Sequence, residues 1–142
     1  MNLTPHFTLE ELTHTDHREL ENIPNEAELA NLKRLAEFLE AVKTVLGDKP
    51  IMVNSAFRSK AVNDAVGSKD TSQHRTGCAA DIRVPGMTPD EVVKAIIAAN
   101  LGHDQVIREF DRWTHVSIPN HTTDKPRLQA LIIDKEGTRF YA

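Results

Sequence analysis

The chain has 142 residues, of which 39% are hydrophobic and 27% are charged, and these values are ordinary for a globular domain. Its net charge of −4 gives no reason to expect a nucleic-acid partner, and the single cysteine, Cys78, excludes an intramolecular disulfide. The first residues lack a basic segment followed by an apolar run, and no apolar run is long enough to span a bilayer. We therefore expect one domain over residues 1–142, made in the cytoplasm as a monomer without a signal peptide.

Three helices are predicted in the first half of the chain, over residues 9–12, Asn25–Leu46 and 60–66. Each has a residue at its start that can cap it, in order Thr8, Asn25 and Ser59. In the long helix, apolar residues recur at steps of three and four, so they share one face that we expect to lie in the core. These residues are Leu29, Leu32, Leu35, Ala36, Leu39, Val42 and Leu46.

The second half of the chain is richer in strand signals. A polar loop over Ser68–Thr76 carries His74 and leads into a predicted central strand. The helix that follows has strong start signals, with a cap at Thr88 and proline at its first position. The predicted elements are a strand at Pro50–Ser55, a strand at Cys78–Val84, a helix from Thr88 to about Asn100, strands at Asp104–Glu109 and Trp113–Ile118, and a closing hairpin of Leu128–Ile133 and Thr138–Tyr141.

The hairpin formed by the strands at 104–109 and 113–118 predicts which side chains share a face. If residues 110–112 are its loop, Glu109 lies opposite Trp113. Paired residues and alternate residues lie on one face of a sheet, so Glu109, Trp113, His115 and Ser117 are expected together. Thr114, Val116 and Ile118 are expected on the opposite face.

Two histidines and one aspartate could form a metal site. His74 and Asp81 are seven positions apart, and His115 lies on a later predicted strand. Three protein ligands are what a catalytic zinc needs if water is to keep the fourth position. The alternative is that the two histidines are unrelated surface residues. For His14 and His17 we find no third ligand, and we expect both to be solvated.

A zinc hydrolase also needs a base that takes a proton from water and passes it to the leaving amine. Glu109 is the preferred candidate, because the hairpin places it about 7–8 Å diagonally from His115 at the backbone. Asp111 is the rival, although it falls in the predicted turn and is expected to point outward. Either carboxylate could instead be an ordinary solvated side chain.

Three further residues could serve such a site. Arg58, at a predicted strand-to-helix junction, could bind a substrate carboxylate with two parallel hydrogen bonds. Ser72 could donate a hydrogen bond to the substrate or belong to the surroundings of the metal ligands. Gly77 and the small residues after it are expected to allow close backbone approach, as a crowded metal site requires.

Several motifs follow one another in a fixed order along nearly the whole chain. The stretch Ser72–Asp81 reads S-Q-H-R-T-G-C-A-A-D, and the later stretch Trp113–His115 reads W-T-H. Phe7–Leu12, Asn54–Ser59 and Asp104–Ile107 add to the pattern. On these residues the chain resembles the zinc D-alanyl-D-alanine peptidases, most closely their compact type from phages and prophages.

The resemblance implies a small α+β fold, with a mostly antiparallel sheet and helices packed on it, as in the Hedgehog signalling domain. It also implies one zinc ion on His74, Asp81 and His115, a catalytic carboxylate shortly before His115, and an arginine such as Arg58 near the substrate. The substrate it implies is peptidoglycan, cut at a peptide bond that involves D-amino acids. The chain departs from relatives at Arg112, where some of them carry the base.

The sequence therefore predicts a zinc metallopeptidase that cuts peptidoglycan stem peptides or cross-links, as a D-Ala-D-Ala carboxypeptidase or endopeptidase. Its site of action is expected to be the cell wall. One alternative is a non-catalytic wall-binding or phage structural module that keeps zinc for stability. Another is a zinc hydrolase for a different small peptide. Glu109 and Arg58 favour an enzyme.

Overall fold

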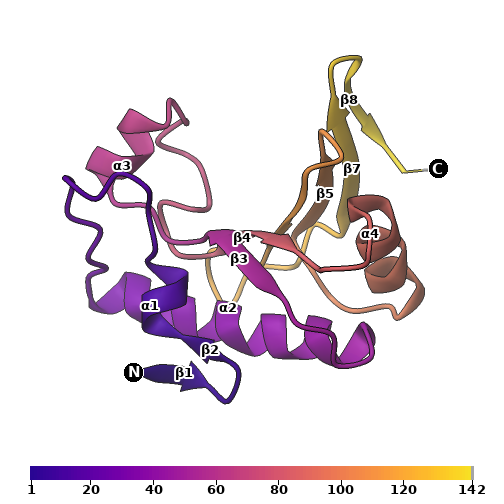
Figure 1. Cartoon of the computed structure of the whole chain (residues 1–142), viewed down its shortest axis with the longest axis horizontal. Coiled ribbons are helices and arrows are strands. Elements are labelled where there is room, and N and C mark those ends of the chain that lie inside the picture. The colour runs from indigo at the N-terminus through magenta and orange to yellow at the C-terminus, as the bar shows by residue number, and fades with distance from the viewer. Residues whose placement is uncertain (142) are drawn as a thin grey trace.

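The computed structural model describes residues 1–141, which form an α+β fold around a six-stranded sheet (Figure 1). The helices are α1 (Leu9–Leu12), α2 (Glu26–Val45), α3 (Lys60–Ala65) and α4 (Pro89–Ala98). The strands are β1 (Asn2–Thr4), β2 (Phe7–Thr8), β3 (Met52–Ser55), β4 (Ala79–Arg83), β5 (Gln105–Glu109), β6 (Trp113–Ser117), β7 (Gln129–Asp134) and β8 (Gly137–Phe140).

The main sheet has the strand order β3-β4-β6-β5-β7-β8. All of its neighbouring strands are antiparallel except β5 and β7, which are parallel. The expected mostly antiparallel sheet is thus confirmed. The small β1–β2 sheet and the parallel pair were not predicted, because strands of two or three residues carry no readable alternation and pairing between distant strands leaves no local signal.

The predicted helix starts are confirmed by their caps. Thr8, Asn25 and Thr88 each accept a hydrogen bond from the backbone amide three residues on, and the glutamate at that position bonds back to the cap. Ser59 caps α3 in the same way through its hydroxyl. Helix α4 ends at Ala98 rather than near Asn100, which has left-handed backbone (φ 52°).

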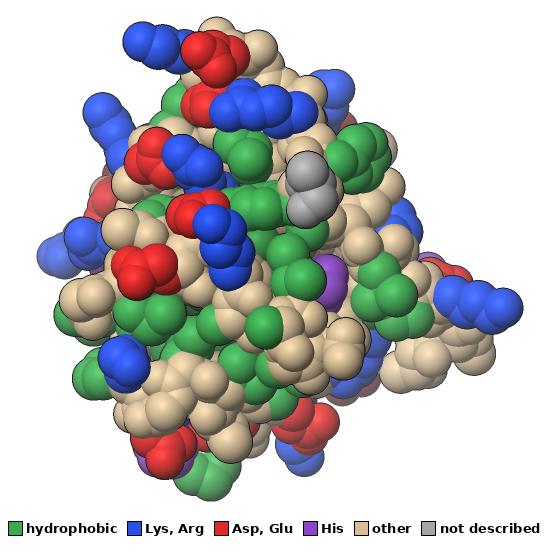
Figure 2. All heavy atoms as spheres, turned by 90° about the vertical axis from the view of Figure 1, so that its right-hand side faces the viewer, with side chains coloured by type: hydrophobic (Ala, Val, Ile, Leu, Met, Phe, Trp, Pro, Cys, Tyr) green, Lys and Arg blue, Asp and Glu red, His purple; other side chains and the backbone are tan. Residues whose placement is uncertain are grey.

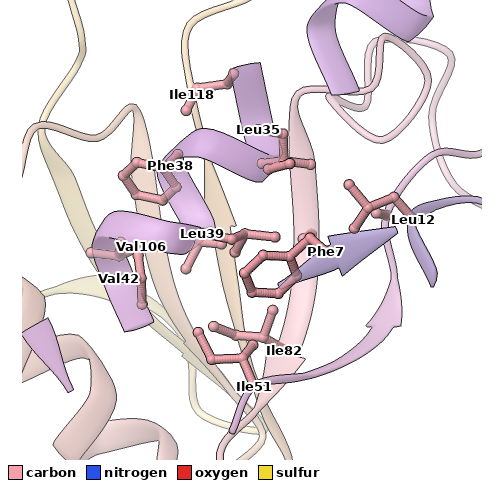
Figure 3. Close-up of a cluster of buried hydrophobic side chains, with 14 of the residues drawn as sticks. Phe7, Leu12, Leu35, Phe38, Leu39, Val42, Ile51, Ile82, Val106 and Ile118 are labelled. Carbon is pink, nitrogen blue, oxygen red and sulfur yellow. The ribbon is translucent and has the colours of Figure 1, made fainter. Parts of the chain in front are cut away.

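The main hydrophobic core lies on the face of the sheet that α2 and α4 cover. Apolar residues of both helices pack there with alternate residues of β4, β5 and β6, including Val116. Figure 3 shows Ile82 and Val106 of this core beside Leu39 and Val42 of α2. The predicted apolar face of α2 is confirmed as part of this core except at Leu29, which is only partly buried, and Phe38 joins it. Because side chains of a strand alternate, the intervening residues Asp81, Ile107 and His115 belong to the opposite face.

The surface around α4 and β8 carries charges of both signs (Figure 2). At the end of the β7–β8 hairpin, Arg139 pairs with Asp134 at 2.9 Å. Among the described helices, none combines the length and the apolar character that a membrane crossing demands.

Candidate metal centre

Three side chains from separate segments converge on one point. His74 comes from the loop between α3 and β4, whereas Asp81 and His115 are direct partners on β4 and β6. The Asp81 Oδ1 atom lies 3.4 Å from His74 Nε2 and 3.0 Å from His115 Nδ1. One ligand atom from each residue lies within 4.8 Å of the other two. The predicted convergence of these three residues is therefore present, and the donor set of two imidazoles and a carboxylate suits Zn²⁺.

The His74 ring is oriented by a backbone group. Its Nδ1 lies 2.7 Å from the carbonyl oxygen of Ala56, so Nδ1–H donates there and the lone pair of Nε2 points to the other ligands. Burial lowers the pKa of His74, which keeps the ring neutral near pH 7, as a metal ligand must be. Sequence reasoning missed this partner, because a backbone carbonyl leaves no trace in the residue type.

Asp81 remains ionised in this setting. Burial alone would raise its pKa, but the attraction of the carboxylate to the His74 and His115 rings, which is strongest when those rings carry a proton, outweighs burial and holds the pKa of Asp81 well below its usual range. Its second oxygen, Oδ2, lies 3.4 Å from the Nη2 of Arg58. The carboxylate therefore has one oxygen directed to the two histidines and one directed to a cation.

Glu109 lies beside the three residues in the predicted way. It pairs with Trp113 across the β5–β6 hairpin, which confirms the expected register, and its Oε1 is 3.8 Å from His115 Nδ1. The indole Nε1–H of Trp113 donates to Glu109 Oε2 at 3.1 Å. Burial, followed by the charge of Asp81, raises the pKa of Glu109. A carboxylate with a raised pKa accepts a proton more readily than an ordinary one.

Asp111, the rival base, is engaged elsewhere. Both of its oxygens are bonded by Arg108, and its side chain is 61% exposed. The hydrogen bonds from Arg108 lower the pKa of Asp111, which makes it a weaker base. The geometry therefore favours Glu109 over Asp111.

Arg58 and Ser72 both contact the ligand residues. Arg58 Nε donates to Ser55 Oγ at 3.2 Å, and its Nη2 faces Asp81, so at least part of the guanidinium supports a ligand. The hydroxyl of Ser72 accepts a hydrogen bond from the amide of His74 at 3.2 Å, and its own proton remains able to donate. Their contacts with substrate stay predictions.

Gly77 departs from expectation in one respect. It has left-handed backbone (φ 81°), but the backbone it approaches belongs to α2 rather than to the metal site. A Cβ at this position would lie 2.9 Å from the carbonyl oxygen of Glu28 and 3.2 Å from Cγ of Leu32. The glycine therefore serves the packing of the His74 loop on α2.

His14 and His17, in the N-terminal part of the chain, do not join this cluster. His14 and His17 form exposed pairs with Asp16 and Glu19, at 3.4 Å and 3.5 Å. This agrees with the expectation that both are solvated.

Comparison with known proteins gives two matches. Residues 5–117 match the family described as peptidase M15. The chain is also similar to the zinc D-Ala-D-Ala carboxypeptidase of Streptomyces albus G, with 48% identity over 44 residues. That alignment covers 31% of this chain and only 17% of the relative.

Proposed function

Because the chain belongs to the peptidase M15 family, we propose that it is a zinc metallopeptidase that hydrolyses peptide bonds of peptidoglycan stem peptides or cross-links, as a D-Ala-D-Ala carboxypeptidase or endopeptidase. The observation that carries the proposal is the cluster of His74, Asp81 and His115 with the half-buried Glu109 next to it. The name of the partial relative supports both the metal and the substrate.

The division of work among the residues follows from their contacts. Zinc, when bound by His74, Asp81 and His115, supplies the Lewis acidity that activates water near neutral pH and polarises the scissile carbonyl. Glu109 takes the proton of the attacking water at Oε1 and later delivers it to the leaving amine. Trp113 holds the other oxygen of Glu109 and so fixes the direction in which Oε1 points.

Arg58 has two roles in the proposal. Its Nη2 stabilises the charge of Asp81, and its remaining guanidinium nitrogen, Nη1, would bind a carboxylate of the substrate. A free C-terminal carboxylate next to the cut, or an acidic side chain of the stem peptide, would fill that position. Ser72 would contribute one hydrogen bond from its hydroxyl proton.

The experiment that tests the proposal is mass spectrometry of purified sacculi after digestion, with and without a chelator. Glu109→Gln should keep zinc and lose about 10²–10⁴-fold in rate, the usual contribution of a general base. Asp111→Asn is the matched control and should retain the activity. If folded, zinc-loaded protein leaves sacculi unchanged, the wall-hydrolase proposal fails and the non-catalytic module becomes the better account. Release of amino groups from other peptides only would support the small-peptide hydrolase.

The resemblance is the support for the finer parts of the proposal, which are a Hedgehog-like arrangement of the fold, an origin in a phage or prophage, and action in the cell wall. A monomeric state and synthesis in the cytoplasm are proposed from the expectations that the sequence raised. Size measurement in solution and cell fractionation would test the last two.

A further inference from the structure

The residue before His74 occupies the centre of a hydrogen-bond network that is separate from the metal ligands. The side-chain nitrogen of Gln73 faces three oxygens, of Ile118 (2.8 Å), Asp104 (3.1 Å) and Asn120 (3.3 Å). Its side-chain oxygen accepts a hydrogen bond from Arg127 at 3.2 Å. One amide thus joins the His74 loop to residues that flank β5, β6 and β7.

The partners of Gln73 are themselves held in place. Asp104 is buried, with a side chain only 6% exposed, and Arg127 neutralises it. The guanidinium of Arg127 donates to Asp104 Oδ2 from Nε at 2.9 Å and from Nη2 at 2.6 Å, and the Arg127 amide donates to Oδ1 at 3.0 Å. Loss of Arg127 would leave the buried Asp104 carboxylate without its cation, which is costly, so the pair is a firm anchor for the glutamine.

The backbone of Gln73 fixes the other side of the loop. Its carbonyl oxygen accepts hydrogen bonds from the amide of Cys78 (2.9 Å), the amide of Thr76 (3.3 Å) and the hydroxyl of Thr76 (3.0 Å). The Thr76 hydroxyl also lies 3.1 Å from Asn120 Oδ1. Hydrogen bonds to the Gln73 carbonyl oxygen therefore hold the turn that leads from Gln73 to β4, although this turn contains no regular helix or strand.

We propose that Gln73 is a positioning residue for the metal centre, because its side-chain amide holds the loop that presents His74 to Asp81 and His115. The proposal rests on the proposed zinc site. His74 is the one ligand that does not lie on a strand, so the sheet register that places Asp81 opposite His115 does not place it. The network around Gln73 holds the loop on the side of β5, β6 and β7, in addition to the hydrogen bond between the His74 ring and the Ala56 carbonyl.

Gln73→Glu is the sharpest test, since it keeps the shape of the side chain and replaces the donor nitrogen with an oxygen that faces three other oxygens. We expect zinc affinity, measured by competition with a chromogenic chelator, to fall about 10–100-fold, the range seen when partners that orient metal ligands are lost. The absorption spectrum of the cobalt-substituted protein should change with it, because His74 moves. Gln105→Glu is the matched control. Gln105 Nε2 donates to Gln129 Oε1 at 2.9 Å, so this exchange also sets an oxygen against an oxygen, but away from the Gln73 network, and zinc affinity should stay within twofold.

The outcomes separate the possibilities. If Gln73→Glu folds and both its zinc affinity and the spectrum of its cobalt-substituted form are unchanged, the proposal is overturned. If Gln73→Glu does not fold, Gln73→Asn replaces it, because the shorter amide cannot reach both Ile118 and Arg127 and buries no charge. Gln73→Asn should bind zinc several-fold more weakly than the wild type. Wild-type affinity in this variant would overturn the proposal. Zinc binding is measured without substrate. A protein whose zinc affinity depends on Gln73 but which leaves sacculi intact would therefore refute the proposed function alone.

Discussion

Gly77→Ala tests the packing of the metal-ligand loop on helix α2. The residue has a backbone φ of 81°, in the region that costs an L-residue about 1–2 kcal/mol. The added methyl would also lie 2.9 Å from the Glu28 carbonyl oxygen and 3.2 Å from Leu32 Cγ. Because Glu28 and Leu32 belong to the long helix α2, whose apolar face is packed in the core, they cannot withdraw freely, and overpacking of this kind costs roughly 1–3 kcal/mol. We therefore expect a loss of about 2–5 kcal/mol in the free energy of unfolding.

Gly67→Ala is the matched control for this measurement. Gly67 has nearly the same backbone conformation, with φ 74°, but a Cβ there would meet no described atom within 4 Å. It should therefore lose only the conformational part, about 1–2 kcal/mol. Urea unfolding of both variants measures the difference between their free energies of unfolding, provided that their m-values are unchanged. If Gly77→Ala is no less stable than Gly67→Ala, the inferred contact between the loop and α2 does not constrain the fold.

Three further predictions address other parts of the structure. Trp113→Phe should keep zinc but lower kcat about 10–100-fold, because a hydrogen bond to charged Glu109 is worth roughly 1.5–3 kcal/mol and about 1.4 kcal/mol is tenfold in rate. An unchanged kcat would exclude a role for the indole. Tyr141, the sole tyrosine, should ionise near pH 12 in absorbance titration, because burial and then Asp90 raise its pKa to about 12, and Asp90→Asn should lower the midpoint of that titration. The contribution of Tyr141 to the free energy of unfolding should be fully present below about pH 10 and be lost between there and about pH 12. Trypsin should cut slowly after Arg127 although that side chain is 48% exposed, because a buried carboxylate holds its guanidinium; rapid cleavage there in folded protein would contradict the network.

The parts of the fold that were predictable are those with a local chemical signature. Helix α2 begins at Asn25 because its side chain and that of Glu28 satisfy each other's backbone amides, and both residue types are visible in the sequence. The β5–β6 hairpin is equally local, so the pairing of Glu109 with Trp113 could be inferred before any coordinates. Such features depend on residues that are near each other in the chain.

The features that escaped prediction depend on contacts between distant segments. The carbonyl of Ala56 that orients His74 is 18 residues away and has no characteristic side chain. The parallel pairing of β5 with β7 is likewise a property of the assembled sheet. Gly77 was correctly seen as a point of close approach, but nothing near it in the sequence named α2 as the partner.

The same hydrophobic pattern that builds the core also assembles the metal centre. Ile82 and Val116 are buried against α2 and α4, while Asp81 and His115, their neighbours in the two strands, face the other way. A slip of one residue by β4 or β6 would turn the side chains of that strand over and move its metal ligand, the Asp81 carboxylate or the His115 imidazole, into the apolar core. An isolated buried charge costs several kcal/mol or more, so burial of the apolar residues excludes the one-residue slips that would separate Asp81 from His115. His74 does not lie on a strand, so the sheet register does not place it, and its loop has to be held by hydrogen bonds of its own.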